Sequence, residues 1–541
     1  MWRLKILLVG VASALRGPVT SIRTNRVLNA AGDWAEARAA AAAASKNRVV
    51  MKFGGSSVAN AERIEHVAKL IASRMDEGIV PTIVLSAMGK TTNEIEAAGR
   101  QALAEGRVRI DHLRALHLET LDALALPASC GYEVRALLRE LESLLDGVSM
   151  VRELTPRTKD LLVSYGERMS SRILAAQLVE AHGIKAVPCE SWKLGLRTTG
   201  AFGEATVDEG CYPDMAKSLR SMVRDRDEVP VVTGYIGTDA EGRVTTLGRG
   251  GSDLTATVLG ACFRHEPERD FYAEVQVWKD VDGMMSADPR VIPEAVPVPY
   301  VTYEEAAELA YFGAQVLHPV AMQPAMRVNI PVRVKNSYNT EAPGTVISEA
   351  KPSQRPSGCD LVSAITSKSN VAMVDIVSTR MLGDYGFLAQ VFDSFKRNKL
   401  SVNVVATSEV SVSLTLNKAI DVLSKVQSGP LNMKWAETQD IEDVGLRSVI
   451  EDLSDVSDIT VTPDRAIITL IANVEQSSAV MATVFGVLKE LGVQVEMLSQ
   501  GASKVNISFI IPGDKEKDVV KALHACFFED TCLVPMEECE A

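Results

Sequence analysis

The chain has 541 residues, too many for one ordinary hydrophobic core, so we expect three or four domains. Hydrophobic residues make up 46% and charged residues 23%, which is ordinary globular usage and excludes a chain that is disordered throughout. The formal net charge of -13 disfavours nucleic acid or an anionic membrane as the main partner, because both require a concentrated positive surface.

Residues 1–47 have the composition of a targeting peptide. They carry five basic residues before the first acid, Asp33, and an alanine run at residues 39–44. A basic, acid-poor leader is typical of transit peptides, which are removed from the mature protein. The apolar run at residues 6–14 leaves a second interpretation open, a secretory signal that forms the first part of a bipartite plastid address. This run is too short to span a bilayer.

From residue 48 to residue 338, short apolar runs alternate with longer amphipathic segments. The short runs are rich in Val and Ile, which predicts buried strands at residues 49–53, 82–87, 185–188, 229–235, 271–278 and 330–335. The amphipathic segments predict helices at residues 61–75, 91–105, 156–182, 253–263 and 304–312. This alternation implies an α/β domain with a mostly parallel sheet, whose ligands bind beyond the carboxyl ends of the strands.

The C-terminal part contains an internal repeat. Residues 339–360 are rich in Pro, Ser and Gly and are expected to form a linker. After it, an offset of 93 positions aligns Ala389, Val391, Phe392, Lys396, Val402 and Val412 with Ala482, Val484, Phe485, Lys489, Val495 and Val505. We interpret residues 361–440 and 460–541 as two copies of one small α/β module, which are expected to bury an edge or a face against each other.

A first glycine-rich turn is expected to bind phosphate. Gly54, Gly55 and Ser56 lie where the first strand ends and a helix begins, so backbone N–H groups and the helix N-terminus can receive an anion. Lys52, one residue inside the strand end, would hold its ammonium group over the same spot. A tight turn with a solvated lysine is the alternative.

A second glycine-rich turn, residues 246–253, also opens a helix. Arg249 within it carries a planar guanidinium that suits a carboxylate or a phosphate. Asp253 is a candidate N-cap that could also hold a catalytic lysine. Two such turns on one sheet argue against coincidence.

Two further segments are candidates for substrate contacts. Gly166 lies inside a predicted helix at a cost of about 1 kcal/mol relative to alanine, so it needs a packing or ligand reason, and the neighbouring Glu167 could receive an ammonium group. A surface glutamate is the alternative. Residues 278–290 follow a buried strand and lack the later acids of a calcium loop, so we interpret them as a nucleotide-side loop in which Lys279 or Arg290 contacts phosphates.

Other common site patterns are missing. The eight cysteines form no CxxC pair and have no histidine at metal-ligand spacing, so we expect reduced thiols and no metal bound by protein side chains alone. Val84 stands where a Walker A loop has its first glycine, and Asp253 stands where a dinucleotide fingerprint has its last small residue. Neither a P-loop NTPase nor a dehydrogenase domain is predicted.

Six ordered blocks resemble those of the aspartate kinases in the amino acid kinase superfamily: KFGGSSV, LSAMGKTTN, SYGERMSS, TTLGRGGSD, WKDVDGMMSADPR and YFGAQVLHP. The resemblance runs from about Val50 to the end of the chain and is strongest to the plant-type monofunctional enzymes. It implies a carbamate kinase-like three-layer α/β fold for residues 48–338 and a βαββαβ ACT fold for each repeat. The implied reaction transfers phosphate from ATP to L-aspartate, the first step toward lysine, threonine and methionine.

The resemblance also implies a role for individual residues. The ATP-binding set comprises Lys52, Gly54, Gly55, Ser56, Ser86, Lys279, Asp280 and Arg290. Catalysis is assigned to Lys52 and Asp253. The substrate amino group is assigned to Glu167 and the α-carboxylate to Arg249, with Thr92 nearby. The effector site comprises Met381, Gly386, Phe387, Leu388, Val402, Asn403, Ser408 and Glu409.

The chemistry of this reaction sets the expected partners. A carboxylate attacking the γ-phosphate brings two anions together, so positive charge and in-line positioning supply most of the catalysis, and no strong general base is needed. We expect Mg²⁺ to arrive with ATP, since no all-protein cage is visible. The implied effector is lysine, with S-adenosylmethionine as an addition, and the implied assembly is a homodimer through the ACT domains, located in plastids.

Some positions depart from the family pattern. Asn403 stands where many lysine-sensitive relatives have aspartate, which removes a charge-assisted bond worth about 1.5 to 3 kcal/mol. Gln315 replaces a lysine of many relatives, and Met284 and Met285 replace bulkier residues in the nucleotide loop.

Two alternatives stay open at this point. One is a kinase of the same fold acting on acetylglutamate, glutamate or a nucleotide. The other is a non-catalytic amino-acid sensor, which would be expected to have lost Lys52, Arg249 or Asp253. A dehydrogenase domain is not expected, because too few residues follow the second repeat.

Overall fold

The computed structural model describes residues 48–263, 271–311, 317–349, 361–378, 386–408, 410–416, 431–433, 443–472, 476–500 and 505–529. The expected leader, residues 1–47, lies outside the described residues. So do Gln315 and two residues of the expected effector site, Met381 and Glu409.

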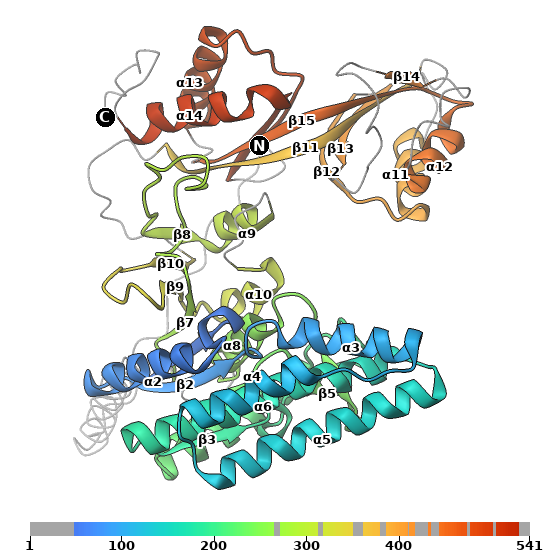
Figure 1. Ribbon diagram of the computed structural model, residues 1–541. Helices are drawn as coiled ribbons and strands as arrows, with labels where there is room; N and C mark the ends of the chain where they lie inside the picture. The colour runs from blue at the N-terminus through green and yellow to red at the C-terminus, as the bar shows by residue number, and fades with distance from the viewer. Residues whose placement is uncertain are drawn as a thin grey trace, which may run out of the picture.

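The N-terminal domain is built on an eight-stranded sheet with the order β3-β4-β2-β1-β7-β9-β10-β8 (Figure 1). All neighbouring strands are parallel except β9 and β10. The predicted strands are confirmed as β1 (Arg48–Phe53), β2 (Val80–Leu85), β3 (Ala186–Cys189), β4 (Val229–Thr233), β7 (Glu274–Lys279) and β9 (Val332–Asn336). β8 (Tyr300–Thr302) and β10 (Thr345–Ser348) were not predicted, and β10 extends this sheet into the segment expected as a linker.

The predicted helices of this domain are confirmed as α2 (Ala61–Asp76), α3 (Thr91–Glu105), α6 (Pro156–His182), α8 (Gly251–Ala261) and α9 (Tyr303–Tyr311). Elements that the sequence did not predict are α4 (Asp111–Ala123), α5 (Ala128–Val151), α7 (Tyr212–Arg220), α10 (Pro319–Val328) and the hairpin of β5 (Ile236–Thr238) and β6 (Val244–Thr246). Helix α10 contains Pro324 in its interior, where proline is not expected, so the sequence pattern did not indicate a helix there.

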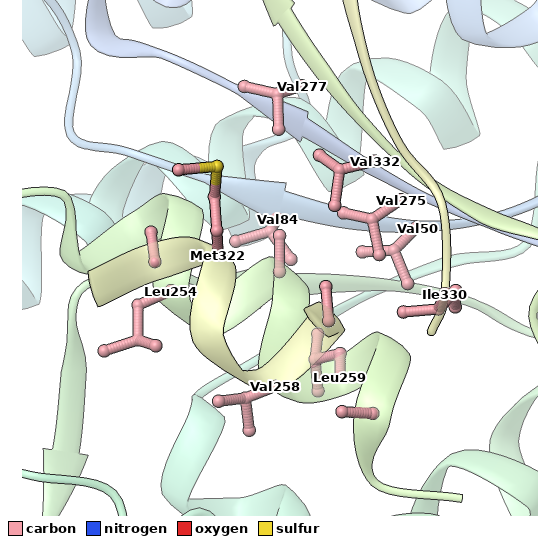
Figure 2. Packing of buried hydrophobic residues seen from close by; sticks show 14 of the residues in the cluster. Val50, Val84, Leu254, Val258, Leu259, Val275, Val277, Met322, Ile330 and Val332 are labelled. Atoms are coloured by element: carbon pink, nitrogen blue, oxygen red, sulfur yellow. The ribbon is translucent and has the colours of Figure 1, made fainter. Parts of the chain in front are cut away.

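The alternation of side chains along β1 divides the core of this domain in two. Val49, Met51 and Phe53 pack with residues of α2, α3, α5 and α6. Val50 points to the opposite face, where Figure 2 shows it with Val275 and Val332 above α8 and α10. Because side chains alternate, Lys52 lies on the α8 face of the sheet, at the carboxyl end of β1.

The C-terminal part is one antiparallel sheet with the order β12-β13-β11-β15-β17-β16, to which β14 is added on β15. Its strands are β11 (Val362–Val377), β12 (Val402–Thr407), β13 (Ser411–Leu416), β14 (Leu431–Met433), β15 (Asp458–Ala472), β16 (Met497–Gln500) and β17 (Asn506–Pro512). Its helices are α11 (Phe387–Arg397), α12 (Val444–Leu453), α13 (Ser477–Glu490) and α14 (Glu516–Phe528). The elements α11, β12 and β13 recur in the same order as α13, β16 and β17.

Two long strands run through both repeats. Figure 1 shows α11 and α12 at one end of β11 and β15, and α13 and α14 at the other. Val374 and Ile376 of β11 pack with α11 and α12 in one core, whereas Val362 and Ile365 of the same strand pack with α13 and α14 in another. We call the part around α11 and α12 the first unit and the part around α13 and α14 the second unit.

The cysteines only partly match expectation. Cys130, Cys189, Cys211 and Cys262 are free and buried. Cys526 on α14 is disulfide-bonded, so the prediction of a reduced thiol is wrong at this position. Throughout the described ranges, no helix combines the length and apolar character needed to cross a membrane, and no three His, Cys, Asp or Glu side chains gather in a way that could hold a metal ion.

Candidate active site

A buried ion pair lies at the carboxyl end of the sheet. Lys52 Nζ is 2.6 Å from Asp253 Oδ1, and both residues are 6% exposed. Asp253 lies in the first turn of α8, where the helix dipole favours negative charge. The ammonium group of Lys52 lies over the first glycine turn, 3.7 Å from where a Cβ on Gly54 would be. The two residues expected to be catalytic are therefore in direct contact.

The first glycine turn packs against the end of β2. A Cβ on Gly55 would lie 2.9 Å from the carbonyl oxygen of Ala87 and 3.0 Å from that of Gly89, so no side chain fits at this position. Gly89 N donates to the carbonyl oxygen of Gly55 at 2.9 Å. Ser86 Oγ donates to Ser252 Oγ at 3.0 Å, which joins the end of β2 to the start of α8. Both predicted turns thus meet at one edge of the sheet.

Helix α6 brings a buried carboxylate to the same edge. A Cβ on Gly166 would lie 2.7 Å from the Cβ of Ala87, which explains why glycine occupies this helix interior. Glu167 Oε1 accepts a hydrogen bond from Ala87 N at 3.1 Å, while Glu167 Oε2 has no partner among the described residues. Burial raises the pKa of Glu167 to about 8. A buried oxygen without a partner is costly, and a cationic ligand would satisfy it.

These groups line one cavity of about 250 Å³, together with a residue that the sequence analysis missed. Its lining consists of Lys52, Ser86, Thr92, Glu167, Tyr235, Gly248, Gly250, Gly251, Ser252 and Asp253. Five expected site residues are thereby brought together: Lys52, Ser86, Thr92, Glu167 and Asp253. Tyr235 was missed, and Ser252 was included only as part of the glycine-rich turn at residues 246–253. Tyr235 lies two residues after the end of β4, so the rule that ligands bind beyond strand ends could have found it.

Tyr235 is held in an unusual conformation. Its φ of 69° is in the left-handed region, which side chains other than glycine rarely adopt. A Cβ on the facing Gly251 would lie 2.7 Å from the Tyr235 ring, so the ring lies directly on the second glycine turn. Burial raises the pKa of Tyr235 to about 12, and its hydroxyl remains a hydrogen-bond donor at neutral pH.

Arg249 points out of this cavity. Gly248 and Gly250, with φ of 71° and 75°, turn the backbone on both sides of it. Arg249 lines an adjoining cavity of about 510 Å³ that also contains His318 and Arg327. The two cavities share Gly248, so Arg249 and Lys52 lie on opposite sides of one loop.

The expected nucleotide loop is only partly gathered at the site. β7 pairs with β1 so that Trp278 lies opposite Phe53, which puts Lys279 beside the first glycine turn. Burial lowers the pKa of Lys279, an effect that Asp253 opposes and Lys52 reinforces. Asp280 and Arg290 are exposed on the loop, and Arg290 Nη2 is bound to Asp288 Oδ2 at 2.7 Å. Ser56 is exposed in the turn after Gly55.

A second buried carboxylate, that of Asp160, links two elements on which the site is built. Asp160 Oδ2 accepts hydrogen bonds from Thr246 N at 2.8 Å and Gly203 N at 2.9 Å, and Asp160 Oδ1 accepts one from Thr246 Oγ1 at 3.0 Å. These bonds tie α6 to the strand that leads into the second glycine turn. The sequence analysis missed Asp160, because nothing in its neighbourhood distinguishes it from a surface residue of an amphipathic helix.

The expected effector residues lie in the first unit. Gly386, Phe387 and Leu388 are at the start of α11, and Val402, Asn403 and Ser408 are in or directly after β12. Tyr311 at the end of α9 donates a long hydrogen bond of 3.4 Å to Asn403 Oδ1. Its hydroxyl group also lies 3.5 Å from the carbonyl oxygen of Val402, so two residues of this group touch the N-terminal domain.

Comparison with known proteins identifies the family. The sequence model of the amino acid kinase family matches residues 47–336, and that of the ACT domain matches residues 468–527. "Aspartokinase 3, chloroplastic" of Arabidopsis thaliana is 46% identical over 491 residues, which cover 89% of this chain and 82% of that protein. This chain belongs to the aspartokinase family.

Other aspartokinases extend the likeness to bacteria. "Lysine-sensitive aspartokinase 3" of Escherichia coli is 33% identical over 89% of this chain and 99% of its own. Crystal structures of E. coli aspartokinase III superpose with TM-scores of 0.67, in complex with aspartate and ADP, and 0.69, in complex with lysine and aspartate. Each covers 89% of this chain, at 31% and 32% identity. The α/β fold with C-terminal ACT units is that of the aspartokinases.

Proposed function

We propose that this aspartokinase transfers the γ-phosphate of ATP to the side-chain carboxylate of L-aspartate in the cavity between Lys52 and Glu167. One observation carries the proposal. The same 250 Å³ cavity holds a buried cation, Lys52, and a buried carboxylate oxygen without a partner, Glu167 Oε2. An amino acid with an ammonium group at one end and a nucleophilic carboxylate at the other complements this arrangement.

Aspartate would be held at both ends of its backbone. Glu167 Oε2 accepts hydrogen bonds from the ammonium group, and Arg249 turns from the adjoining cavity around Gly248 to bind the α-carboxylate. Thr92 lines the cavity beside Glu167. The side-chain carboxylate is then left to face Lys52. Enzymes that act on acetylglutamate are disfavoured, because their substrate carries no ammonium group to satisfy Glu167.

The glycine turns and lysines would hold the nucleotide phosphates. Backbone N–H groups at Gly54 and Gly55, with Ser56 and Ser86, surround the phosphates, and Lys52 neutralises the charge that develops on the transferred group. Asp253 keeps the Lys52 ammonium in place. Lys279, Asp280 and Arg290 complete the nucleotide side once Arg290 leaves Asp288.

Mg²⁺ fits this site as an ion carried in by ATP. Magnesium commonly binds through one or two carboxylates plus phosphate oxygens, and Asp253 and Asp280 could supply such carboxylates on the nucleotide side of the site. When bound, the ion supplies charge neutralisation for the phosphates. The residues of this chain orient the ATP phosphates and the side-chain carboxylate of aspartate relative to each other.

Regulation, assembly and location are part of the same proposal. Lysine would bind in the first unit around Phe387 and Asn403, with S-adenosylmethionine as a second effector, and two copies would associate through their ACT sheets. The Arabidopsis relative is named as chloroplastic, which supports a plastid location after removal of residues 1–47.

The test is an assay of purified protein lacking residues 1–47 with ATP and a panel of acceptor amino acids. Aspartate should be the preferred acceptor. Lys52→Ala should lower kcat by about a hundred- to a thousandfold, the effect of removing one preorganised transition-state donor. Equal rates with glutamate or acetylglutamate, or an unchanged kcat in K52A, would contradict the proposal.

Glu167 should make the affinity for aspartate depend on pH. Because its pKa is raised to about 8, the empty site is protonated at lower pH, and binding of an ammonium group must release that proton. Aspartate affinity should therefore rise by up to about tenfold per pH unit below pH 8 and level off above it. Calorimetry in buffers of different ionisation enthalpy measures the released proton. Glu167→Gln should lose both aspartate binding and proton release while staying folded.

A further inference from the structure

The expected nucleotide loop is anchored in the second unit. Ser286, four residues before Arg290, is fully buried. Its carbonyl oxygen accepts a hydrogen bond of 2.7 Å from Ile365 N on β11, and its backbone N donates to Val296 O at 2.8 Å. Ser286 Oγ accepts from Val296 N at 2.9 Å and lies 2.9 Å from Nε2 of His524 on α14. Two of these four contacts thus come from the C-terminal part of the chain.

His524 is itself held by a carboxylate. Its Nδ1 is 2.6 Å from Glu529 Oε1, its ring stacks on Phe528, and it is fully buried. With the ring hydrogen on Nδ1, every group has a partner: Nδ1 donates a hydrogen bond to Glu529 Oε1, and Nε2 accepts one from the Ser286 hydroxyl group. The carboxylate therefore fixes the orientation of the ring, and the ring fixes the hydroxyl of Ser286.

This Ser–His–Glu series has the hydrogen-bond order of a hydrolytic triad, but it is not one. Neither Ser286 nor His524 lines any of the cavities described above, and both are fully buried, so no substrate can reach the hydroxyl group. A buried chain of satisfied polar groups instead fixes a unique local structure. What it fixes here is the second half of the nucleotide loop.

Apolar packing strengthens the same junction. Ala287 and Ile292, on either side of Arg290, belong to the buried core of the second unit together with Val362 and Leu523. The loop that begins at Lys279 beside the phosphate turn therefore ends inside the core of the second unit.

We propose that His524 is a positioning residue for the nucleotide loop, acting through Ser286, so that the second unit forms part of the ATP site. The inference rests on the proposed function, because it takes residues 279–290 as the nucleotide side of the cavity. Its consequence is specific: loss of the His524 contact should raise KM for ATP and leave the aspartate side of the cavity intact.

The test compares His524→Ala, Ser286→Ala and His524→Gln in the enzyme lacking only residues 1–47. Loss of one buried hydrogen bond should raise KM for ATP about tenfold in H524A and S286A, with KM for aspartate within about twofold of wild type. H524Q restores an acceptor near the position of Nε2 and should recover most of the loss. The double variant S286A/H524A should be no worse than either single variant, because both remove the same contact.

Asn506→Ala is the matched control. Asn506 Nδ2 donates to Glu308 Oε2 at 2.6 Å, so this variant also breaks a bond between the second unit and the N-terminal domain, but at α9 instead of the loop. N506A should leave KM for ATP unchanged. If H524A does not fold, S286A, which removes only a hydroxyl group, tests the inference by the same comparison of KM for ATP with KM for aspartate.

Two results would overturn the inference: equal rises of both KM values in H524A and S286A, or an unchanged KM for ATP in both. An inactive wild-type enzyme would instead refute the proposed function, so the two failures are distinguishable.

Discussion

The two C-terminal units repeat one fold, but they meet the N-terminal domain in different ways. The second unit contacts it through a shared apolar core that includes Ala287 and Ile292, and through the buried pair of Ser286 and His524. The first unit, within the described residues, contacts it through Tyr311, which is exposed and makes hydrogen bonds of 3.4 and 3.5 Å with β12.

The corresponding effector positions differ as well. The offset of 93 positions places Glu496 in the second unit where the first unit has Asn403. Glu496 Oε2 accepts a hydrogen bond from Arg465 Nε at 2.5 Å, so its carboxylate is already neutralised by this chain's own arginine. Asn403 is half-buried and carries no charge. The second unit is therefore built into the N-terminal domain through a shared core, whereas the described contacts of the first unit with that domain are long hydrogen bonds at an exposed tyrosine.

The two units should differ most in their effect on activity when the core of each is disrupted by the same kind of substitution. Phe509 in the second unit and Phe395 in the first are both buried, and replacing either by alanine should cost about 3 to 5 kcal/mol of local stability. Phe509→Ala should abolish most kinase activity, because the nucleotide loop loses its anchor. Phe395→Ala should keep basal activity and lose the response to lysine. Thermal unfolding with assays in both conditions measures this, and equal losses of activity would refute the division.

A smaller effect is expected at the effector positions themselves. Asn403→Asp adds a carboxylate that can pair with an ammonium group, so the lysine concentration for half-inhibition should fall about tenfold. Glu496→Gln, at the equivalent position of the second unit, should leave lysine inhibition as it is. Inhibition curves for both variants provide the measurement. If E496Q changes the lysine concentration for half-inhibition and N403D does not, lysine binds in the second unit and the comparison is contradicted.

The smallest effect should come from the contact of the first unit with α9. Tyr311→Phe removes a hydroxyl group whose hydrogen bond to Asn403 is long, so its contribution is about 0.5 kcal/mol, or about a twofold change. Half-inhibition by lysine should shift by that factor, with kcat unchanged. A large loss of kcat would mean that the first unit, too, supports the catalytic site.

Much of the fold and part of the site were predictable from the sequence. Apolar runs located six of the eight strands of the N-terminal sheet, and the interior Gly166 pointed to Glu167. Alternation along β1 and the adjacent glycine turn are enough to direct Lys52 toward the phosphate site. The strands β8 and β10, of three and four residues, were missed because segments so short show no clear periodicity.

The links between distant parts of the chain were not predictable. Ser286 and His524 are separated by 238 positions, and although Ser286 lies in the block of residues 278–290, nothing in that block points to a histidine near the end of the chain. Their pairing depends on how α14 packs against β11, which local patterns do not encode. The orientation of Arg249 into the adjoining cavity was missed for a similar reason, since it depends on the φ angles of Gly248 and Gly250.

Amide hydrogen exchange with and without an ATP analogue tests the division of the two units most directly. The N–H of Ile365, which donates to Ser286, and residues 505–529 should exchange more slowly when the nucleotide binds, whereas residues 386–416 should change little. Protection of residues 386–416 alone, or of both segments equally, would contradict the claim that the second unit forms part of the nucleotide site.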